Sequence, residues 1–391
     1  MQEEAGRLSL QLVDGMEGIT PEEWAVCAAG VTGGADNPFI SHDFLDILEL
    51  SGSVGGESGW QPRHLTLRGE DGRLLAAMPL YVKAHSYGEY VFDQGWANAF
   101  EQAGGRYYPK LLSAVPFTPV TGPRLLMRAD APAGVVPTMI RALERIVADN
   151  GLSGVHVTFP TAEQADQLQG AGWLRRTGMQ YHWTNQGYGS FEDFLARFSS
   201  RKRKAVRKER QAVADSGLVL ETLTGDAIEP RHWAAFDRLY RATSDRKWGW
   251  PYLTRQFFTL LGERMADQVV LVMARDGEHY VGGALNLLGG DTLYGRNWGG
   301  VGEYPFLHFE TCYYRALDFA IERGLARVEA GAQGEHKIQR GYLPVPTYSA
   351  HWIADPGFRR AVDRYLAQER PAVQAEIEAL GEELSPYRRE G

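Results

Sequence analysis

An order of elements that occurs twice is the feature of this chain that most constrains its fold. Residues 63–83 carry apolar runs on both sides of an Asp-Gly pair, and residues 268–288 repeat that pattern, so each stretch predicts a β-hairpin. A strand, a helix and a short strand are expected next in each half. In the first half they span residues 89–94, 135–149 and 154–159. In the second half they span residues 292–298, 306–323 and 326–332. Two copies of one α/β unit would produce this order. Coincidence among short strands is the alternative, since Asp-Gly hairpins are common.

The length of the chain supports two domains. We place them at residues 1–185 and 186–391 of the 391-residue sequence. Residues 190–217 lie at their junction and predict one long, highly charged linking helix. Residues 358–384 predict a second charged helical stretch, broken at Pro371, whose tail would return to the first domain.

Composition and charge exclude several classes of protein. A hydrophobic share of 44% is enough to build real cores, and a formal net charge of −8 argues against a general polyanion binder. The two cysteines, Cys27 and Cys312, are far apart, so we expect neither a disulfide framework nor a metal site. The acidic amino terminus predicts no signal peptide, and no apolar run is long enough to span a membrane. We therefore expect a cytoplasmic protein.

Residues 291–342 hold the most informative local pattern. Phe309, Tyr313 and Leu317 recur at helical spacing, so one face of a helix is buried there. Polar residues gather in the loop after the next expected strand: Gln333, Glu335, His336 and Lys337. Polar groups at the ends of neighbouring strands are typical of a reaction site on an α/β unit.

Several segments carry a resemblance to a known family. The most specific are SSRKRKAVRKER, SDRKWGWPYLT, LYGRNWG, PFLHFETCYY and EAGAQGEHKIQRGYLPVPTYSAHW. Together they resemble the FemAB-like N-acyltransferases, a branch of the tandem GNAT superfamily, from near Asn37 to near Tyr348. The resemblance implies an α/β (α+β) fold with two tandem GNAT-like domains and mixed central sheets. It also implies acyl or aminoacyl transfer to an amine.

The resemblance implies a donor site in the second domain. GNAT proteins usually bind the pyrophosphate of coenzyme A on amides at a helix start, but residues 297–305 lack the usual glycine spacing, and Glu303 adds negative charge. A plain tight turn that needs glycine is the alternative there. Fem-type enzymes similarly lack the motif, so we favour aminoacyl-tRNA as co-substrate over acyl-CoA and expect no tightly bound cofactor. The expected donor contacts are Arg203, Lys204, Arg207, Asn297, Trp298, Gly300 and Gln333.

The basic run at residues 201–210 bears on the same choice. A helix would place Arg203, Arg207 and Arg210 on one face, with Lys204 beside them. Such a strip suits the neutralisation of phosphates along an RNA backbone, and Fem-type transferases show a similar basic helix. A solvated charged face is the alternative, since most charge runs are only that.

Four residues are candidates for catalysis. Amide formation requires removal of a proton from the attacking ammonium, which His308 or Glu310 in the first helical turn could accept. Glu310 could instead complement the helix dipole, and His308 could be a semi-buried histidine. The resemblance implies that Lys337 contacts the donor or stabilises the developing oxyanion, with His336 at a position where the family has an aromatic residue. Surface ion pairing of Lys337 is the alternative.

The first domain would supply the acceptor groove. Its aromatic, acidic and basic residues could hold a polar substrate with an amine, and the cleft between the halves could add further contacts. The expected acceptor contacts are Asp93, Trp96, Tyr107, Lys110, Arg246, Lys247 and Trp248. An aromatic core with a solvated rim is the alternative.

The sequence therefore predicts an N-acyltransferase that joins an activated acyl or aminoacyl group to a substrate amine. The acceptor would be a small molecule or a peptide, and tRNA would be a partner. An acyl-CoA-dependent N-acetyltransferase is the first alternative, and a non-catalytic ligand-binding module with a duplicated fold is the second. The sequence specifies no oligomeric state.

Overall fold

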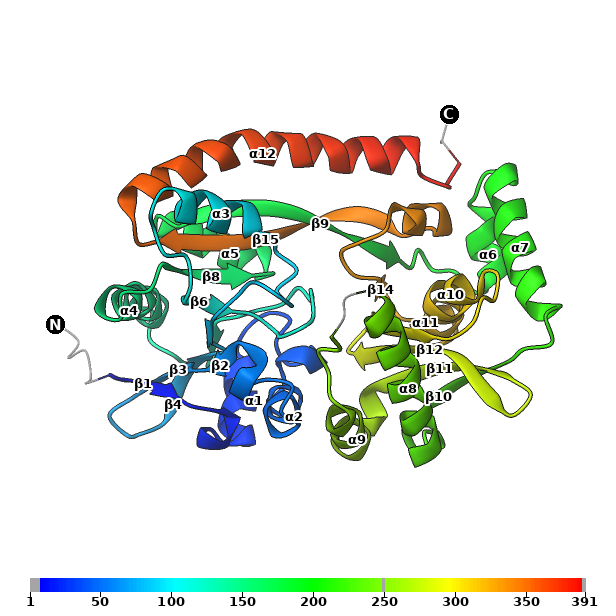
Figure 1. Ribbon diagram of the computed structural model, residues 1–391, viewed down its shortest axis with the longest axis horizontal. Helices are drawn as coiled ribbons and strands as arrows, with labels where there is room; N and C mark the ends of the chain where they lie inside the picture. Colours follow the sequence, from blue (N-terminus) through cyan, green and yellow to red (C-terminus); the bar gives the residue numbers. More distant parts are fainter. Residues whose placement is uncertain (1–7, 248–249, 389–391) are drawn as a thin grey trace. The chain divides into compact units, whose positions relative to one another are not determined.

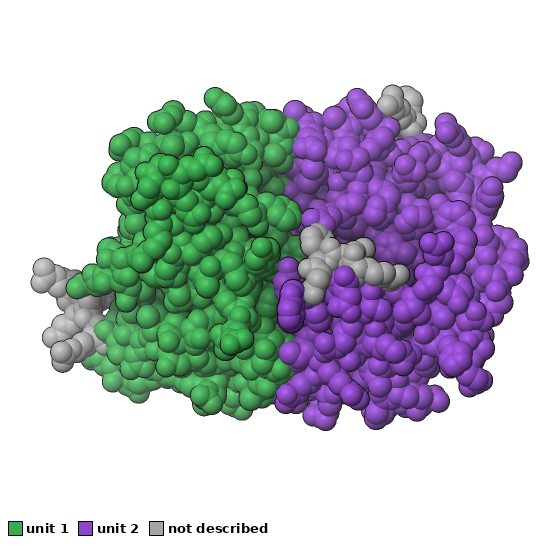
Figure 2. Space-filling view, viewed as in Figure 1, with its two compact units in different colours: residues 1–178, 347–374 green, residues 179–346, 375–391 purple. Residues whose placement is uncertain are grey.

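The computed structural model describes residues 8–247 and 250–388, without the side chains of residues 246 and 247 (Figure 1). Two compact units are coloured separately in Figure 2. Unit 1 comprises residues 8–178 and 347–374, and unit 2 comprises residues 179–346 and 375–388 of the described chain. Within that described part, no helix combines the length and the apolar character needed to cross a bilayer.

Unit 1 is built from two sheets and the helices that cover them. The strand orders are β2-β5-β6-β8-β15 and β1-β3-β4-β7. The strands are β1 (Ser9–Val13), β2 (Trp60–Pro62), β3 (His64–Arg68), β4 (Leu74–Met78), β5 (Tyr81–Lys83), β6 (Lys110–Ser113), β7 (Leu126–Met127), β8 (Gly154–Thr158) and β15 (Leu343–Ile353). The helices are α1 (Pro21–Ala29), α2 (His42–Leu50), α3 (Gln94–Gln102), α4 (Val135–Asp149) and α5 (Ala162–Gly170). Met139, Leu143 and Val147 form the apolar face of α4 and pack in a core with Val155 and Val157.

Unit 2 contains one sheet with the strand order β10-β11-β12-β13-β14-β9. Its strands are β9 (Leu174–Thr184), β10 (Val219–Thr224), β11 (Val269–Asp276), β12 (His279–Gly289), β13 (Thr292–Gly300) and β14 (Arg327–Glu329). Its helices are α6 (Phe191–Ala196), α7 (Ser200–Ala214), α8 (Pro230–Lys247), α9 (Arg255–Arg264), α10 (Leu307–Phe309), the π-helical turn η6 (Glu310–Tyr314), α11 (Arg315–Glu322) and the 3-10 helix η7 (Glu335–Arg340). The division between the units falls within the last helix, α12 (Pro356–Glu383).

Each unit contains the same local arrangement of three strands. In unit 1, β6 and β8 are parallel and β15 is antiparallel to β8. In unit 2, β13 and β14 are parallel and β9 is antiparallel to β14. The chain passes from unit 1 to unit 2 within β9 and returns within β15, so the units are not contiguous in sequence. The repeated order of elements therefore corresponds to a repeated structure, although the unit boundaries differ from the expected residues 1–185 and 186–391.

Most of the predicted elements are confirmed. The apolar periodicity of residues 135–149 gives α4 with those bounds, and both Asp-Gly hairpins are present as β3–β4 and β11–β12. The predicted helix at residues 306–323 is a helical run from Leu307 to Glu322 that contains the π-helical turn η6. Such turns often occur at functional sites.

Three predictions of secondary structure were wrong. Residues 89–94 form no strand, because Glu89 and Asp93 turn inward to the ammonium group of Lys110. The stretch 190–217 forms two helices, since the amide of Ser199 donates to the carbonyl of Pro386 and interrupts the helical ladder. Pro371 does not break the last helix, and α12 continues through it.

Candidate functional site

The parallel pairing of β13 with β14 stops early. The ladder joins Thr292–Tyr294 to Arg327–Glu329, whereas β13 continues to Gly300. At the same point, the register against β12 shifts, because Gly295 lies opposite Asn286 and Asn297 lies opposite Leu285. Arg296 is therefore the extra residue of a β-bulge in β13. A bulge bends its strand and redirects side chains, and it often occurs beside an active site.

Buried polar side chains gather at this bulge. The Nη2 atom of Arg296 lies 3.6 Å from Glu329 Oε2, and the Nε2 atom of His182 lies 3.9 Å from the same oxygen. His182 Nε2 is also 3.4 Å from Gln180 Oε1. Glu329 is 2% exposed, and its Oε2 has no hydrogen-bond partner among the described residues. An unsatisfied buried carboxylate oxygen is costly and needs an explanation, such as a ligand or water.

Burial also determines the charge of His182. Removal from water lowers the pKa of its imidazole, and this effect outweighs the opposing influence of Glu329. His182 is therefore neutral near pH 7 and can accept a proton. No pattern in the sequence points to this residue, since β9 reaches the site only through the exchange of strands between the two halves of the chain.

Lys337 projects from η7 to the same place. Its Nζ atom donates to the carbonyl oxygens of Ala330 at 2.6 Å and Gly331 at 3.4 Å, just beyond the end of β14. Burial lowers the pKa of Lys337 to about 8, Cys312 opposes that shift and Arg296 adds to it. Lys337 is thus held at the carboxyl end of β14, the strand that carries Glu329, and the positive charges of Arg296 and Lys337 both contribute to the lowered pKa of His182.

His308 and His336 lie close to each other in unit 2. Their ring centroids are 6.1 Å apart, and Tyr313 contacts both rings, with its hydroxyl 3.0 Å from His336 Nε2. The ring of His308 is also 5.2 Å from that of Trp298. Because His336 precedes Lys337 in η7, the expected catalytic residues of the loop and of the helix share one region of unit 2.

Glu310 has a different environment. It is buried, and its carboxylate accepts from Arg210 at 3.0 and 3.2 Å and pairs with Arg315 at 3.2 Å. Both carboxylate oxygens of Glu310 are therefore in contact with guanidinium groups from α7 and α11. These contacts attach α7 to η6, and a role of Glu310 in proton removal stays a prediction.

The expected donor contacts lie on two surfaces. Trp298 and Gly300 line a hollow of about 390 Å³ together with His308, while Asn297 is half-buried and Gln333 is exposed. On α7, Lys204 and Arg207 are exposed and Arg203 is half-buried.

The basic face of α7 is narrower than expected. Arg210 turns inward to Glu310 and Asp318, so it does not share the exposed face with Arg203 and Arg207. Arg207 itself pairs with Glu192 on α6.

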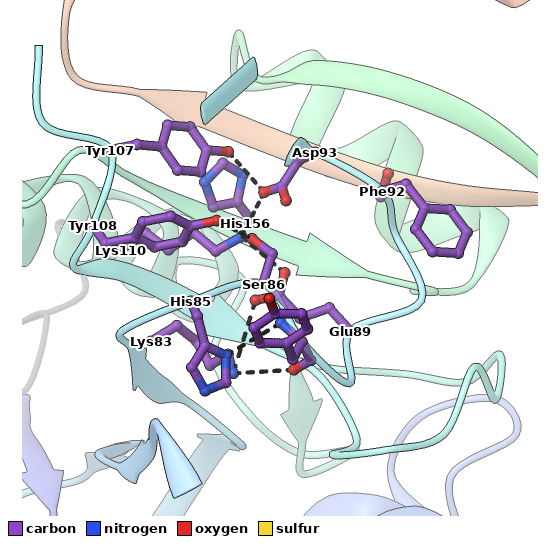
Figure 3. Close-up of polar contacts among 12 residues, drawn as sticks. Lys83, His85, Ser86, Glu89, Phe92, Asp93, Tyr107, Tyr108, Lys110 and His156 are labelled. Atoms are coloured by element: carbon purple, nitrogen blue, oxygen red, sulfur yellow. Dashed lines mark hydrogen bonds and ion pairs between the residues drawn. The ribbon is translucent and has the colours of Figure 1, made fainter. Parts of the chain in front are cut away.

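Three of the expected acceptor contacts meet inside unit 1 (Figure 3). Lys110 Nζ donates to Ser86 Oγ at 2.8 Å, Glu89 Oε2 at 2.8 Å and Asp93 Oδ2 at 2.5 Å. Tyr107 donates to the same oxygen of Asp93 at 2.7 Å. All of these side chains are buried, so they face one another and do not line an open groove.

The other expected acceptor contacts lie elsewhere. Trp96 is buried in a small apolar cluster of unit 1, with its ring 4.9 Å from that of His351. Arg246 and Lys247 belong to the end of α8, and Trp248 lies outside the described residues.

Comparison with known proteins identifies the family. The model of the FemAB-like family, described as peptidoglycan biosynthesis/recognition, matches residues 15–389. The chain belongs to the FemAB-like family. No match was found among the curated proteins. The expected family and enzyme class are therefore confirmed, and this FemAB-like protein is an acyltransferase.

Solved structures confirm the fold. The structure of FemX is 12% identical with a TM-score of 0.52, covering 92% of this chain and 98% of that one. The L-PGS from Bacillus licheniformis is 9% identical with a TM-score of 0.53 and covers 92% and 98% of the two chains. At such low identity these likenesses support the shared α/β fold alone.

Proposed function

We propose that this FemAB-like protein transfers an aminoacyl group from aminoacyl-tRNA to a substrate amine, and that the reaction occurs at the bulge of β13. The observation that carries the proposal is the approach of Arg296 and His182 to the buried Oε2 atom of Glu329, at 3.6 and 3.9 Å, with Lys337 held at the end of the same strand, where pairing between β13 and β14 stops. Fixed charges in a buried site are well suited to stabilise charge that develops during a reaction.

In the proposed reaction an ester and an amine form an amide, and different residues support the separate steps. The amine nitrogen attacks the ester carbonyl, a C–N bond forms, the C–O bond to the ribose breaks, and the released oxygen takes up a proton. Lys337 and Arg296 provide positive charge for the oxyanion formed in that attack. To His182, which faces Glu329, and to His308, which lines the hollow at Trp298, we assign acceptance of the proton lost by the amine.

The loop after β13 favours this donor over acyl-CoA. A pyrophosphate cradle requires backbone amides that point to the ligand. Here the amide of Gly300 donates to Thr243 Oγ1, that of Val301 to the carbonyl of Val281, and that of Leu307 to the carbonyl of Tyr304. The exposed part of α7 supplies positive charge for an RNA backbone instead, through Lys204 and Arg207.

The hollow beside this loop favours acyl-CoA as the second candidate donor. It holds about 390 Å³ and reaches His308 and Trp298, so it could accept part of a coenzyme. For the acceptor, the family description suggests a peptidoglycan precursor with a free amine. The proposed donor makes tRNA a partner of this chain.

A paired titration distinguishes the two donors. Aminoacyl-tRNA and acetyl-CoA are each titrated at several salt concentrations, with binding and amide formation measured on one preparation. We expect binding of aminoacyl-tRNA to weaken steeply with salt, by about tenfold or more between 50 and 200 mM, because counterions are released from the RNA. Tight acetyl-CoA binding with turnover, and no salt-dependent RNA binding, would overturn the choice of donor.

A further inference from the structure

Glu209 of the helix α7 contacts the loop that carries His336 and Lys337. Glu209 accepts from Arg340 Nη2 through both carboxylate oxygens, each at 2.8 Å, and it also accepts from the hydroxyl of Tyr314. Arg340 is 6% exposed. Such a charge-assisted contact between partly buried groups is stronger than a hydrogen bond between neutral groups.

Arg340 extends that contact into the catalytic loop. Its Nη1 donates to the carbonyl oxygen of His336 at 2.7 Å, and its guanidinium carbon lies 3.4 Å from the ring centroid of Phe309. One side chain therefore contacts α7, the end of α10 and η7. Arg210 adds contacts from α7 to η6 and α11 within unit 2, through Glu310 and Asp318.

The loop that carries His336 and Lys337 depends on such contacts for its position. It begins at Gly334 with φ 103° and ends at Gly341 with φ 92°, both in the region that favours glycine. Between them lies only the short 3-10 helix η7, a type of helix with weak hydrogen-bond geometry. The side-chain contacts of Lys337 with Ala330 and of Arg340 with Glu209 therefore contribute to where the functional groups of η7 lie.

We propose that Glu209 and Arg340 are positioning residues, which we call the α7 clamp, and that the clamp holds His336 and Lys337 in their reactive arrangement. This inference rests on the proposed function. In this proposal α7 has two roles. Its exposed basic face binds an RNA backbone, and its clamp residue Glu209 orients the loop that carries His336 and Lys337. Neither clamp residue touches the reacting atoms.

The test combines Glu209→Ala with the isosteric Glu209→Gln. We expect kcat to fall about 10- to 100-fold in Glu209→Ala while KM for the donor stays within about twofold, since small displacements of catalytic groups are costly whereas substrate contacts remain. Glu209→Gln keeps the shape and one acceptor, so it should lie between. Gln211→Ala is the matched control, because it removes only an exposed hydrogen bond to Asp215 on the same helix.

Amide hydrogen exchange gives a readout that needs no substrate. We expect residues 331–342 to lose protection about tenfold in Glu209→Ala and to keep it in Gln211→Ala. Unchanged protection in Glu209→Ala overturns the clamp, whether or not transfer is seen. Lost protection with wild-type kcat overturns its positioning role. Absence of turnover by the wild-type protein with every donor would instead contradict the proposed function, and the exchange data would still judge the clamp.

Discussion

Lys337→Met should lower kcat by about 10²- to 10³-fold and leave the fold intact. Removal of one preorganised group that stabilises an oxyanion typically has this effect. Methionine keeps the apolar stem in its buried place but removes the charge that lies at the end of β14. The measurement is single-turnover transfer with the donor that the titration selects, alongside thermal unfolding. Gln339→Ala is the control, because it alters an exposed residue of the same short helix.

The pH dependence of transfer reports which form of Lys337 acts. Its folded pKa of about 8 lies below the ordinary value, so its positive charge is lost as the pH rises through about 8. We expect kcat to fall across that range in the wild-type protein and to stay level in Lys337→Arg, which remains charged. A rate that rises through pH 8 would mean that Lys337 accepts the proton, and it would contradict the assigned role.

Lys110→Met should destabilise unit 1 by about 3–5 kcal/mol, since removal of one partner leaves buried charges uncompensated. Lys110 donates to Glu89 and Asp93, both buried, and only Lys83 would remain as a nearby cation among the described side chains, 4.0 Å from Glu89. Urea unfolding, with amide exchange of α4 and β8 to locate the change, measures the loss. Arg145→Met is the control, because it removes an exposed pair with Asp149 and should cost less than about 0.5 kcal/mol.

The same variant should change how stability responds to acid. Burial raises the pKa of Asp93, but the ammonium of Lys110 outweighs it, so the folded pKa lies below the ordinary 3.8. A depressed carboxyl pKa gives stability that is present above pH 3.8 and is lost as the pH falls below it. Lys110→Met should lack this part of the acid response. A variant as stable as the wild-type protein would contradict the network in Figure 3.

Local periodicity predicted much of the fold. The helical spacing of Met139, Leu143 and Val147 determined α4, and the alternating apolar residues beside each Asp-Gly pair determined the hairpins. These elements follow from short-range patterns that tertiary contacts reinforce. The strands β9 and β15 were not predicted, because their partners are distant in sequence and their role depends on the exchange between the two halves.

The candidate site was predictable only in part. Lys337, His336 and His308 were named from the sequence, and the structure brings them into one region. Arg296, Glu329 and His182 were missed as a cluster, because a bulge in β13 leaves no mark in a single sequence. Asp93, Tyr107 and Lys110 were recognised as a group, but their burial could not be deduced, since charged residues are rarely inside unless paired.

Amide exchange with a bound donor analogue tests the central claim most directly. The probe is an aminoacyl-adenosine in which an amide replaces the reactive ester, added in excess to the full chain. We predict protection in residues 292–300 and 327–342, which carry the bulge of β13, Glu329 and Lys337. Protection confined to the Lys110 network of unit 1, with no change in those two segments, would contradict a reaction site at the bulge.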